Sequence, residues 1–414
     1  MQIPSHGRSW DELAPQLEAA KEKDFSWRKG RMAFYFYYLD EALAEVQKKA
    51  YTSYWTENNL GKGAFPSLAK LEAEVIDFSL ALFHAPHGAA ATFTSGGSES
   101  IFLALQTARD AARAERGIRE PNFVVPRTAH PAFSRAGHAL GIDIRRTPTT
   151  RADFRADVQG MESRIDANTI GLVGSAPNYP YGVFDPIEQL GKLAQSRGLW
   201  LHVDACVGGF LSPWVARLGY PIPSWDFSVP GVTSMSADLH KYGMAPKGAS
   251  LMLLRSDEIK QKHQKFDFRD WERGQYATFV MQGTRPGGAV AAAWAVINHL
   301  GEDGYLRCAR LIMDTKASLV EGINRIPGLA VLEPHELCIF VTRATDPELD
   351  MGAVSDALFA RGWYVGRQAE PRGIHMALNP VHHESIGQYL SDLRDSVDEV
   401  RKLKAVGSAA GQTY

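Results

Sequence analysis

Short apolar runs alternate with amphipathic segments from about residue 89 to residue 255 of the chain. The apolar runs suit buried strands, and the amphipathic segments repeat apolar residues every three or four positions, as a helix with one buried face does. Alternation of this kind is typical of βαβ units around a mainly parallel sheet. We therefore predict a doubly wound α/β layer with strands at 89–93, 122–126, 142–146, 169–175, 199–205, 231–237 and 249–254.

The hydrophobic pattern changes after the segment GTRPGG at 283–288. A long helical stretch follows, and two or three further strands alternate with helices as far as about residue 404. This second pattern indicates a smaller α+β domain. We divide the chain into a mostly helical extension at 1–60, a large ligand-binding domain at 61–288, the small domain at 289–404 and a flexible tail at 405–414.

Charge and composition narrow the classes of partner. The chain has 45 Lys and Arg against 47 Asp and Glu, and no long basic or acidic block. This balance disfavours nucleic acid and anionic membranes, so small molecules are the expected partners. No apolar run is long enough to cross a membrane, and the first residues lack the layout of a signal peptide. Cys206, Cys308 and Cys338 are too scattered for a disulfide framework or a zinc site, so we expect a cytoplasmic protein without a bound metal.

The segment TSGGSES at 94–100 joins a predicted strand to a predicted helix. Ligands of doubly wound sheets bind outside the carboxyl ends of the strands, and a helix N-terminus with free N–H groups suits a phosphate. The segment lacks the spacing of a P-loop or of a dinucleotide fingerprint, so nucleotides are disfavoured. A plain helix cap, with Glu99 supporting the first turn, is an equally good interpretation of this segment alone.

Two further strand ends carry side chains suited to chemistry. In the run LWLHVDACVGG at 199–209, His202, Asp204 and Cys206 fall on one face by strand alternation. A carboxylate at the tip of a buried strand needs a cationic partner or good hydrogen bonds, although Asp204 could also cap the following turn. His130 follows another predicted strand, but a histidine beside a proline more often starts a helix than performs catalysis.

The combination of these features is more specific than any one of them. Pyridoxal phosphate has a phosphate to be cradled, a ring to be stacked, a ring nitrogen to be kept protonated and an aldehyde that forms a Schiff base with a lysine. The segment SADLHKYGMAPKG at 236–248 supplies two lysines, Lys241 and Lys247. A lysine must be neutral to attack an aldehyde, so we expect the surroundings of Lys241 to lower its pKa.

Five segments in order, TSGGSES, HPAFSRAG, GSAPNYPYGVFDPI, HVDACVGGF and SADLHKYGMAPKG, resemble the group II pyridoxal-dependent decarboxylases, and among them the sphingosine-1-phosphate lyases. The resemblance covers about residues 50–300 and is looser beyond. It implies a fold-type I homodimer with shared active sites, in which pyridoxal 5'-phosphate is bound covalently and an amine is the substrate.

The resemblance also implies a role for each matching residue. Lys241 would bind the cofactor aldehyde, Asp204 would pair with the ring nitrogen, His130 would stack on one face of the ring and Cys206 would pack on the other. Gly97, Ser98, Ser236 and His240 would contact the phosphate, and Thr284 of MQGTRPGG would reach the phosphate of the partner subunit. Lys247 would help to hold an anionic group of the substrate, although a lysine before a glycine can also simply solvate a turn.

One segment departs from the pattern of the lyases. They carry a histidine in a segment like Asn-Pro-Leu-His-Pro-Asp, and this chain has NNLGKGAFPS at 58–67, with Gly61 in the histidine position. The long-chain phosphorylated substrate is therefore in doubt. Lys62 could contact a different anion, or could be an ordinary solvated lysine, and the aromatic run at 34–38 could line an entrance or serve packing.

These observations favour a carbon–carbon lyase that cleaves a phosphorylated amino alcohol or β-hydroxy amine into an aldehyde and an amine. The alternative within the same family is an L-amino-acid decarboxylase. A catalytically silent scaffold is a third interpretation, which the complete set of cofactor residues disfavours.

Overall fold

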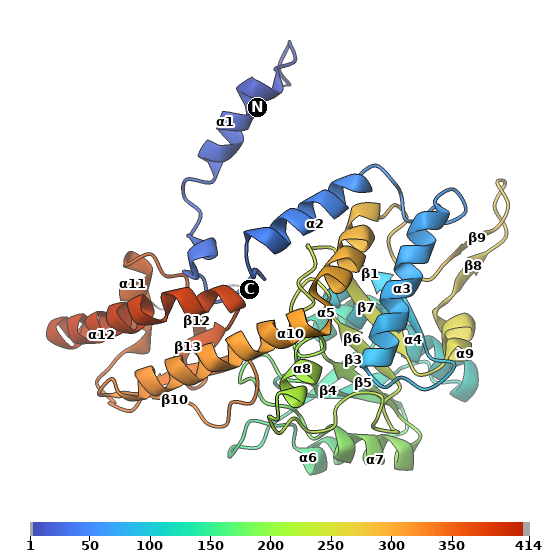
Figure 1. Cartoon of the computed structure of the whole chain (residues 1–414). Coiled ribbons are helices and arrows are strands. Elements are labelled where there is room, and N and C mark those ends of the chain that lie inside the picture. Colours follow the sequence, from blue (N-terminus) through green and yellow to red (C-terminus); the bar gives the residue numbers. More distant parts are fainter. Residues whose placement is uncertain (1–2, 409–414) are drawn as a thin grey trace.

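The structure of the chain is a computed structural model that describes residues 3–408 (Figure 1). A seven-stranded sheet forms its centre, in the order β1-β7-β6-β5-β4-β2-β3. All seven predicted strands are present, within one to three residues of their expected ends. Their bounds are β1 (Ala90–Thr94), β2 (Asn122–Pro126), β3 (Asp143–Thr147), β4 (Thr169–Ser175), β5 (Trp200–Asp204), β6 (Ser234–Ala237) and β7 (Ser250–Leu254).

The sheet is mainly parallel, which confirms the predicted fold class. β7 alone runs antiparallel to its two neighbours, β1 and β6. Both faces of the sheet are buried, because successive residues of a strand pack into different hydrophobic clusters: Val124 belongs to one cluster, and Phe123 and Val125 belong to the other. Helices α3 (Pro66–Leu82), α4 (Gly97–Arg116), α5 (Ala132–Leu140), α6 (Val158–Glu162), α7 (Ile187–Arg197) and α8 (Ser212–Arg217) surround the sheet.

The small domain has more strands than the sequence predicted. An antiparallel sheet in the order β10-β11-β13-β12 is formed by β10 (Leu329–Val331), β11 (Ile339–Ala344), β12 (Gly366–Ala369) and β13 (Arg372–Ala377). The expectation of two or three strands was wrong because β10 and β12 are short. Helices α11 (Met351–Ala360) and α12 (Ile386–Leu403) pack together on this domain, with the short helix η3 (Pro380–Ser385) before α12.

Helix α10 (Gly287–Asn324) joins the two domains, as Figure 1 shows, and it is interrupted at Gly301. That residue has φ 57° and ψ −173°, a conformation that a side chain would strain. The first part of α10 packs on α2 (Glu41–Ser53) and α3, and the later part contacts η3, α12 and β10. The exact domain boundaries stay a prediction.

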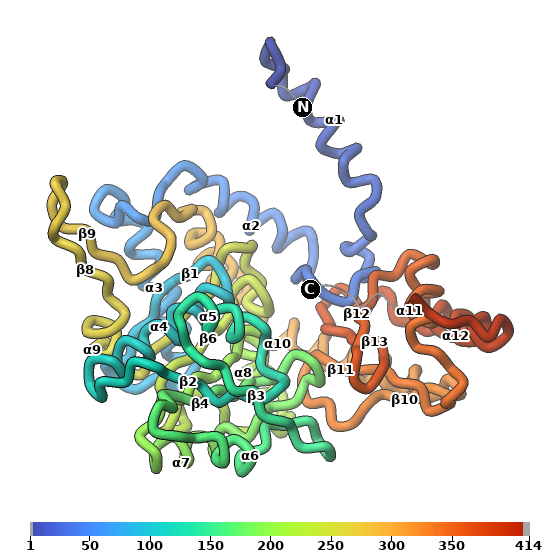
Figure 2. The backbone as a smooth tube through the Cα atoms, turned by 180° about the vertical axis from the view of Figure 1, so that it is seen from behind, coloured from blue at the N-terminus to red at the C-terminus, as the bar shows by residue number. Residues whose placement is uncertain are grey.

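The predicted N-terminal extension is helical, but it is not one unit. Helix α1 (Trp10–Ala20) buries no residue and projects from the body, and the hairpin of β8 (Phe266–Phe268) and β9 (Tyr276–Thr278) also projects (Figure 2). After the turn η1 (Trp27–Lys29), residues 30–33 pair with the small domain, where Ala33 N–H donates to the Tyr364 carbonyl at 2.8 Å. Of the tail predicted at 405–414, residues 409–414 lie outside the described part of the chain.

No helix within residues 3–408 has both the length and the apolar character that a membrane crossing requires. The remaining helical elements, α9 (Asp257–Ile259) and η2 (Lys260–Gln264), lead from β7 into the projecting hairpin.

Candidate active site

A cavity of ≈ 400 Å³ opens at the carboxyl ends of the central strands, where the sequence predicted a ligand site. Its walls come from the segments that follow β1, β2, β4, β5 and β6. The lining includes seven of the predicted site residues: Gly97, Ser98, His130, Asp204, Cys206, His240 and Lys241.

The N-terminus of α4 forms one wall of the cavity. The Glu99 side chain points back toward Ser95, which lies four residues earlier. Its Oε2 accepts hydrogen bonds from both the backbone N–H and the hydroxyl of Ser95 at 2.7 Å. Gly97 is tightly enclosed, since a Cβ at this position would lie 2.6 Å from the Cys206 Sγ. The two interpretations of TSGGSES are therefore compatible: Glu99 supports the first turn, and the start of the 20-residue helix faces the cavity.

Asp204 is the last residue of β5, and two hydrogen bonds orient its carboxylate. Its Oδ1 accepts hydrogen bonds from the Cys206 N–H at 3.1 Å and from the Ser236 hydroxyl at 3.3 Å. Behind them, His202 is fully buried, with its ring nitrogens 2.8 Å from the Ser234 Oγ and 3.2 Å from the Ser236 Oγ. Burial lowers the pKa of His202 to about 4, so this imidazole is neutral and orients the hydroxyls beneath Asp204.

Ser236 lies elsewhere than its predicted role requires. The sequence assigned it to the phosphate, but its hydroxyl is fully buried among Asp204, His202 and Cys206, and it does not line the cavity. The physical reason is strand alternation, because Ser236 is paired with Asp204 on the neighbouring strand β5 and points to the same side. The geometry gives Ser236 a supporting contact with the carboxylate instead.

His130 and Cys206 flank the cavity as neutral groups. The Nδ1 of His130 accepts a hydrogen bond from the Ala132 N–H at 3.1 Å, and burial lowers the pKa of this histidine. Burial, with the nearby Asp204 and Asp238 charges, raises the pKa of the Cys206 thiol well above its ordinary value. Both side chains can therefore flank a flat ring without bringing a charge to its faces.

Lys241 extends into the cavity from the turn after β6, as predicted. Its Nζ lies 3.1 Å from the Oδ2 of Asp238, a buried carboxylate that the sequence analysis did not single out. The signal for Asp238 was available, because it stands in the same turn as Lys241, three residues before it. The Nε2 of His240 is 3.5 Å from the same carboxylate oxygen.

The expected lowering of the lysine pKa is wrong for this geometry. Burial does lower the pKa of Lys241, but the charge of Asp238, with smaller contributions from Cys206, Tyr37 and Asp204, raises it well above its ordinary value. Burial raises the pKa of Asp238, but Lys241, His240 and Ser250 together lower it below its ordinary value. The two groups form a buried ion pair.

Lys247 does not line this cavity, and instead borders a neighbouring hollow whose walls include Trp27, Tyr35 and Tyr37. Its ammonium donates to the His240 carbonyl at 3.2 Å and lies 4.7 Å from the centre of the Tyr37 ring. Partial loss of solvent, with the charge of Lys241, lowers the pKa of Lys247 to about 8. The hollow includes most of the aromatic run at 34–38, so part of that run does line a concave surface.

Thr284 also lies outside the lining of the cavity. Its hydroxyl oxygen accepts a hydrogen bond from the Asn58 side chain at 3.3 Å, which ties the segment GTRPGG to the segment that contains Gly61. Lys62 is not a free cation there, since its Nζ forms an ion pair with Glu72 at 2.7 Å. Within one chain, these residues contact each other and not the cavity.

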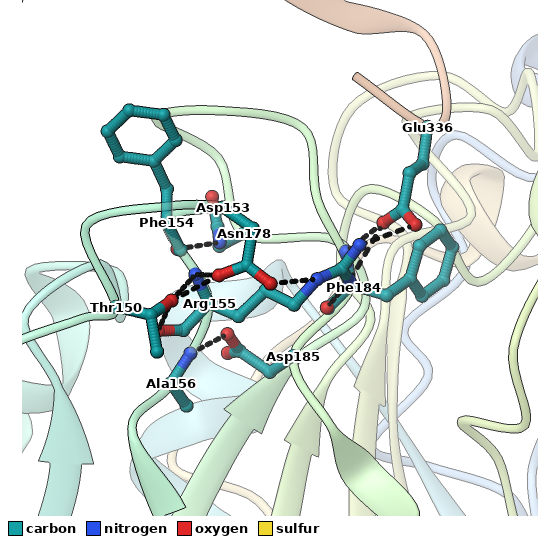
Figure 3. A network of polar contacts seen from close by, with 9 residues as sticks. All are labelled: Thr150, Asp153, Phe154, Arg155, Ala156, Asn178, Phe184, Asp185 and Glu336. Atoms are coloured by element: carbon teal, nitrogen blue, oxygen red, sulfur yellow. Dashed lines mark hydrogen bonds and ion pairs between the residues drawn. The ribbon is translucent and has the colours of Figure 1, made fainter. Parts of the chain in front are cut away.

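The end of β4 and the loop after it reach the cavity through Ser175, Pro177 and Tyr179. A polar network outside the cavity holds this loop in place (Figure 3). Arg155 binds Glu336 of the small domain at 2.7 Å and also donates to the Phe184 carbonyl. The Asp185 carboxylate accepts from the Ala156 and Ser175 N–H groups at 2.8 Å. This network, whose labelled residues Figure 3 draws together, joins the small domain to the loop that carries Tyr179.

The cavity suits pyridoxal phosphate on several independent grounds. The start of α4 offers a phosphate site, and Gly97 leaves no room for a side chain there. An amine and a supported carboxylate, Lys241 and Asp204, face the same space. One buried oxygen of Asp238 has no hydrogen-bond partner among the described residues.

Comparisons with known proteins agree with this fit. Residues 35–338 match the model of the pyridoxal-dependent decarboxylase conserved domain. The chain is 38% identical to the sphingosine-1-phosphate lyase of Oryza sativa subsp. japonica over 97% of this chain and 75% of the relative. It is 37% identical to sphingosine-1-phosphate lyase 1 of Rattus norvegicus over 100% of this chain and 72% of the relative.

The fold also resembles solved structures. The sphingosine-1-phosphate lyase of Burkholderia pseudomallei superimposes with a TM-score of 0.93 at 35% identity, covering 97% of this chain and 93% of that one. A glutamate decarboxylase of Lactobacillus brevis, at 20% identity, shares the fold with a TM-score of 0.86, covering 99% of this chain and 96% of that one. The chain therefore belongs to the pyridoxal-dependent decarboxylase family, has the fold-type I architecture and is a lyase that depends on pyridoxal 5'-phosphate.

Proposed function

We propose that the protein is a carbon–carbon lyase that cleaves a phosphorylated amino alcohol or related β-hydroxy amine into an aldehyde and an amine. The observation that carries this proposal is the similarity to sphingosine-1-phosphate lyases along nearly the whole chain, at 33–38% identity in organisms as different as Oryza sativa and Dictyostelium discoideum. Relatives named as decarboxylases among the solved structures are less similar, at 20% identity or below.

The residues of the cavity fit the requirements of this reaction. Bound pyridoxal phosphate supplies an electron sink for the electrons released when a bond at the substrate carbon next to the amine breaks. Asp204 would hold a proton on the ring nitrogen, and the hydrogen bonds from Ser236 and Cys206 orient its carboxylate. His130 would cover one face of the ring, and Lys241 would hold the cofactor covalently between turnovers.

We further infer that two copies of the chain share their active sites. Thr284 does not line the cavity of its own chain, and its hydroxyl accepts a hydrogen bond from Asn58. The nearby hairpin exposes Phe266, Phe268 and Trp271 at 53%, 44% and 49%, and α1 exposes Trp10. Apolar surface of this kind on projecting elements suits an interface with a second copy.

The substrate is proposed to be shorter than a long-chain sphingoid base. Because Gly61 stands in the histidine position, the chain lacks the imidazole expected from the resemblance. The adjacent Lys62 forms an ion pair with Glu72. The substrate phosphate would then depend more on Lys247, whose ammonium is mostly charged at neutral pH with a pKa of about 8. A cytoplasmic location stays a prediction.

The test is a product assay with purified protein and a panel of amines. A lyase of the proposed type releases aldehyde and no carbon dioxide, with a short phosphorylated β-hydroxy amine turned over faster than sphingosine phosphate. Release of carbon dioxide from an L-amino acid, without aldehyde, would establish the decarboxylase alternative instead. Equal turnover of sphingosine phosphate would refute the shorter substrate while leaving the reaction type intact.

A further inference from the structure

Two carboxylates reach the cavity from neighbouring strands, and the proposed reaction uses only one of them. Asp204 ends β5, and Asp238 directly follows β6. Asp238 is 2% exposed, so almost no water compensates its charge. A group buried in this way is costly unless a positive charge lies against it.

That positive charge is Lys241, whose Nζ is 3.1 Å from the Asp238 Oδ2. Among residues 3–408 this is the only ion pair that Lys241 forms. The Asp238 Oδ1 is buried without a hydrogen-bond partner in the same part of the chain, and a Cβ on Gly97 would lie 3.0 Å from both carboxylate oxygens. The Asp238 carboxylate therefore lies between Lys241 and the start of α4.

The other charged and titratable groups around this pair come from several elements. Cys206 and Asp204 approach Lys241 from β5 and its following turn, and Tyr37 approaches from the aromatic run. His240 approaches Asp238 within the turn itself, with its Nε2 at 3.5 Å. His130, from the segment after β2, and Lys247, further along the chain, also interact electrostatically with both members of the pair. Of the groups that favour the ammonium form of Lys241, Asp238 has the largest effect.

We propose that Asp238 is the counter-ion that stabilises Lys241 as a free ammonium group, so that it opposes bonding of the lysine to the cofactor and favours release of the lysine. An ammonium group has no free electron pair and cannot attack an aldehyde. With the cofactor bound, the amino group of the substrate would replace Lys241 on the aldehyde carbon, and the protons that the incoming ammonium group loses would pass to the released lysine. A partner that stabilises the ammonium form of that lysine would lower the free energy of this state. Asp238 acts on the cofactor only through Lys241, so it is a positioning residue.

The proposal predicts two effects of opposite sign for Asp238→Asn. With the carboxylate gone, burial lowers the pKa of Lys241 without opposition, so a larger fraction of the amine is neutral at pH 7. Attachment of added pyridoxal phosphate to protein stripped of cofactor should become faster by about tenfold for each unit by which the lysine pKa falls. Turnover should become slower, because the released lysine is no longer stabilised.

Attachment is measured by stopped-flow absorbance of the bound cofactor at pH values from about 6 to about 9, below the ordinary pKa of lysine. Borohydride trapping then shows that the attached residue is Lys241. In Asp238→Asn the rate should reach its plateau at lower pH than in the parent protein. Asp238→Glu keeps the charge and should keep slow attachment. Asp226→Asn removes a buried carboxylate that does not line the cavity and lies 2.7 Å from His84, and it should not accelerate attachment.

A purely structural role for Asp238 would lower attachment and turnover together. Folded Asp238→Asn that attaches the cofactor no faster than the parent at any pH would overturn the proposal. Asp238→Ser removes the same charge with a smaller side chain, and it serves as the test if the Asn variant fails to fold by circular dichroism. The inference is independent of which bond the enzyme breaks, because attachment is measured without substrate.

Discussion

The cofactor cavity is formed by the ends of buried strands, whereas Thr284 and Gly61 lie on segments outside its lining. In the cavity, strand ends bring Asp204 and Lys241 together, and buried partners fix both. The segments around Thr284 and Gly61 are joined through Asn58, and neither Thr284 nor Gly61 lines the cavity. Exposed aromatic residues lie on the hairpin that precedes Thr284 in the chain. The residues that would hold the cofactor ring come from one chain, whereas the second region is the one that we propose to contact another copy.

This difference suggests how the protein divides its tasks. A central sheet with fixed register can hold the reacting groups of the cofactor precisely, because each strand end is determined by its hydrogen-bonded neighbours. Loops at an interface can change without disturbing that sheet. The departure from the lyase pattern at Gly61 falls in such a loop, which fits a change of substrate with the cofactor chemistry retained.

The largest effect on activity is expected from replacing Lys241, the amine that would bind the cofactor. Lys241→Ala should abolish both covalent attachment of the cofactor and turnover. Lys247 borders the neighbouring hollow. Lys247→Ala should leave attachment intact and raise KM more than it lowers kcat, if its ammonium holds the substrate as we propose. Peptide mapping after borohydride reduction distinguishes the two lysines, and a pyridoxyl label on Lys247 would overturn the assignment.

The next largest effect concerns the electron sink. Asp204→Asn should bind the cofactor but lose about 10²–10⁴-fold in kcat, since a neutral amide does not hold a proton on the ring nitrogen. Its neighbours Ser236 and Cys206 can still hydrogen-bond the amide, so the fold should be kept. Steady-state kinetics on cofactor-saturated protein measure the loss, and near-normal turnover would show that Asp204 has another role.

The sequence predicted the cavity better than it predicted the contacts within it. Strand patterning located all seven central strands, and the residues after them reached the cavity because parallel strands end at one edge. The position of Ser236 beneath Asp204 depends on the pairing of β5 with β6, which one sequence does not reveal. Asp238 lies in a turn just past β6, where strand alternation no longer gives a direction, so its ion pair with Lys241 was missed.

A smaller effect tests whether the peripheral segments complete the cavity of a partner. Mixing inactive Lys241→Ala protein with an inactive Thr284→Ala variant should restore part of the activity, because one site of each mixed dimer would contain both wild-type residues. Subunit exchange is verified first with differently tagged chains. Rescue should fail in a control mixture of Lys241→Ala with Asp204→Asn, since both of those residues belong to the same cavity. Exchange without any rescue by the Thr284 variant would contradict a shared site.

The smallest effect concerns the contacts that hold peripheral segments to the small domain. The Nε2 of His382 is 2.6 Å from the Met32 carbonyl, and burial lowers the pKa of this histidine to about 4. An unfolded chain would bind a proton there near pH 6.5, so the folded state loses stability as the pH falls from about 6.5 to about 4. One such histidine adds up to about 1.4 kcal/mol per pH unit to the slope. His382→Gln should reduce this slope in urea unfolding between pH 7 and pH 5, whereas an unchanged slope would mean that the histidine is not neutral and buried in solution.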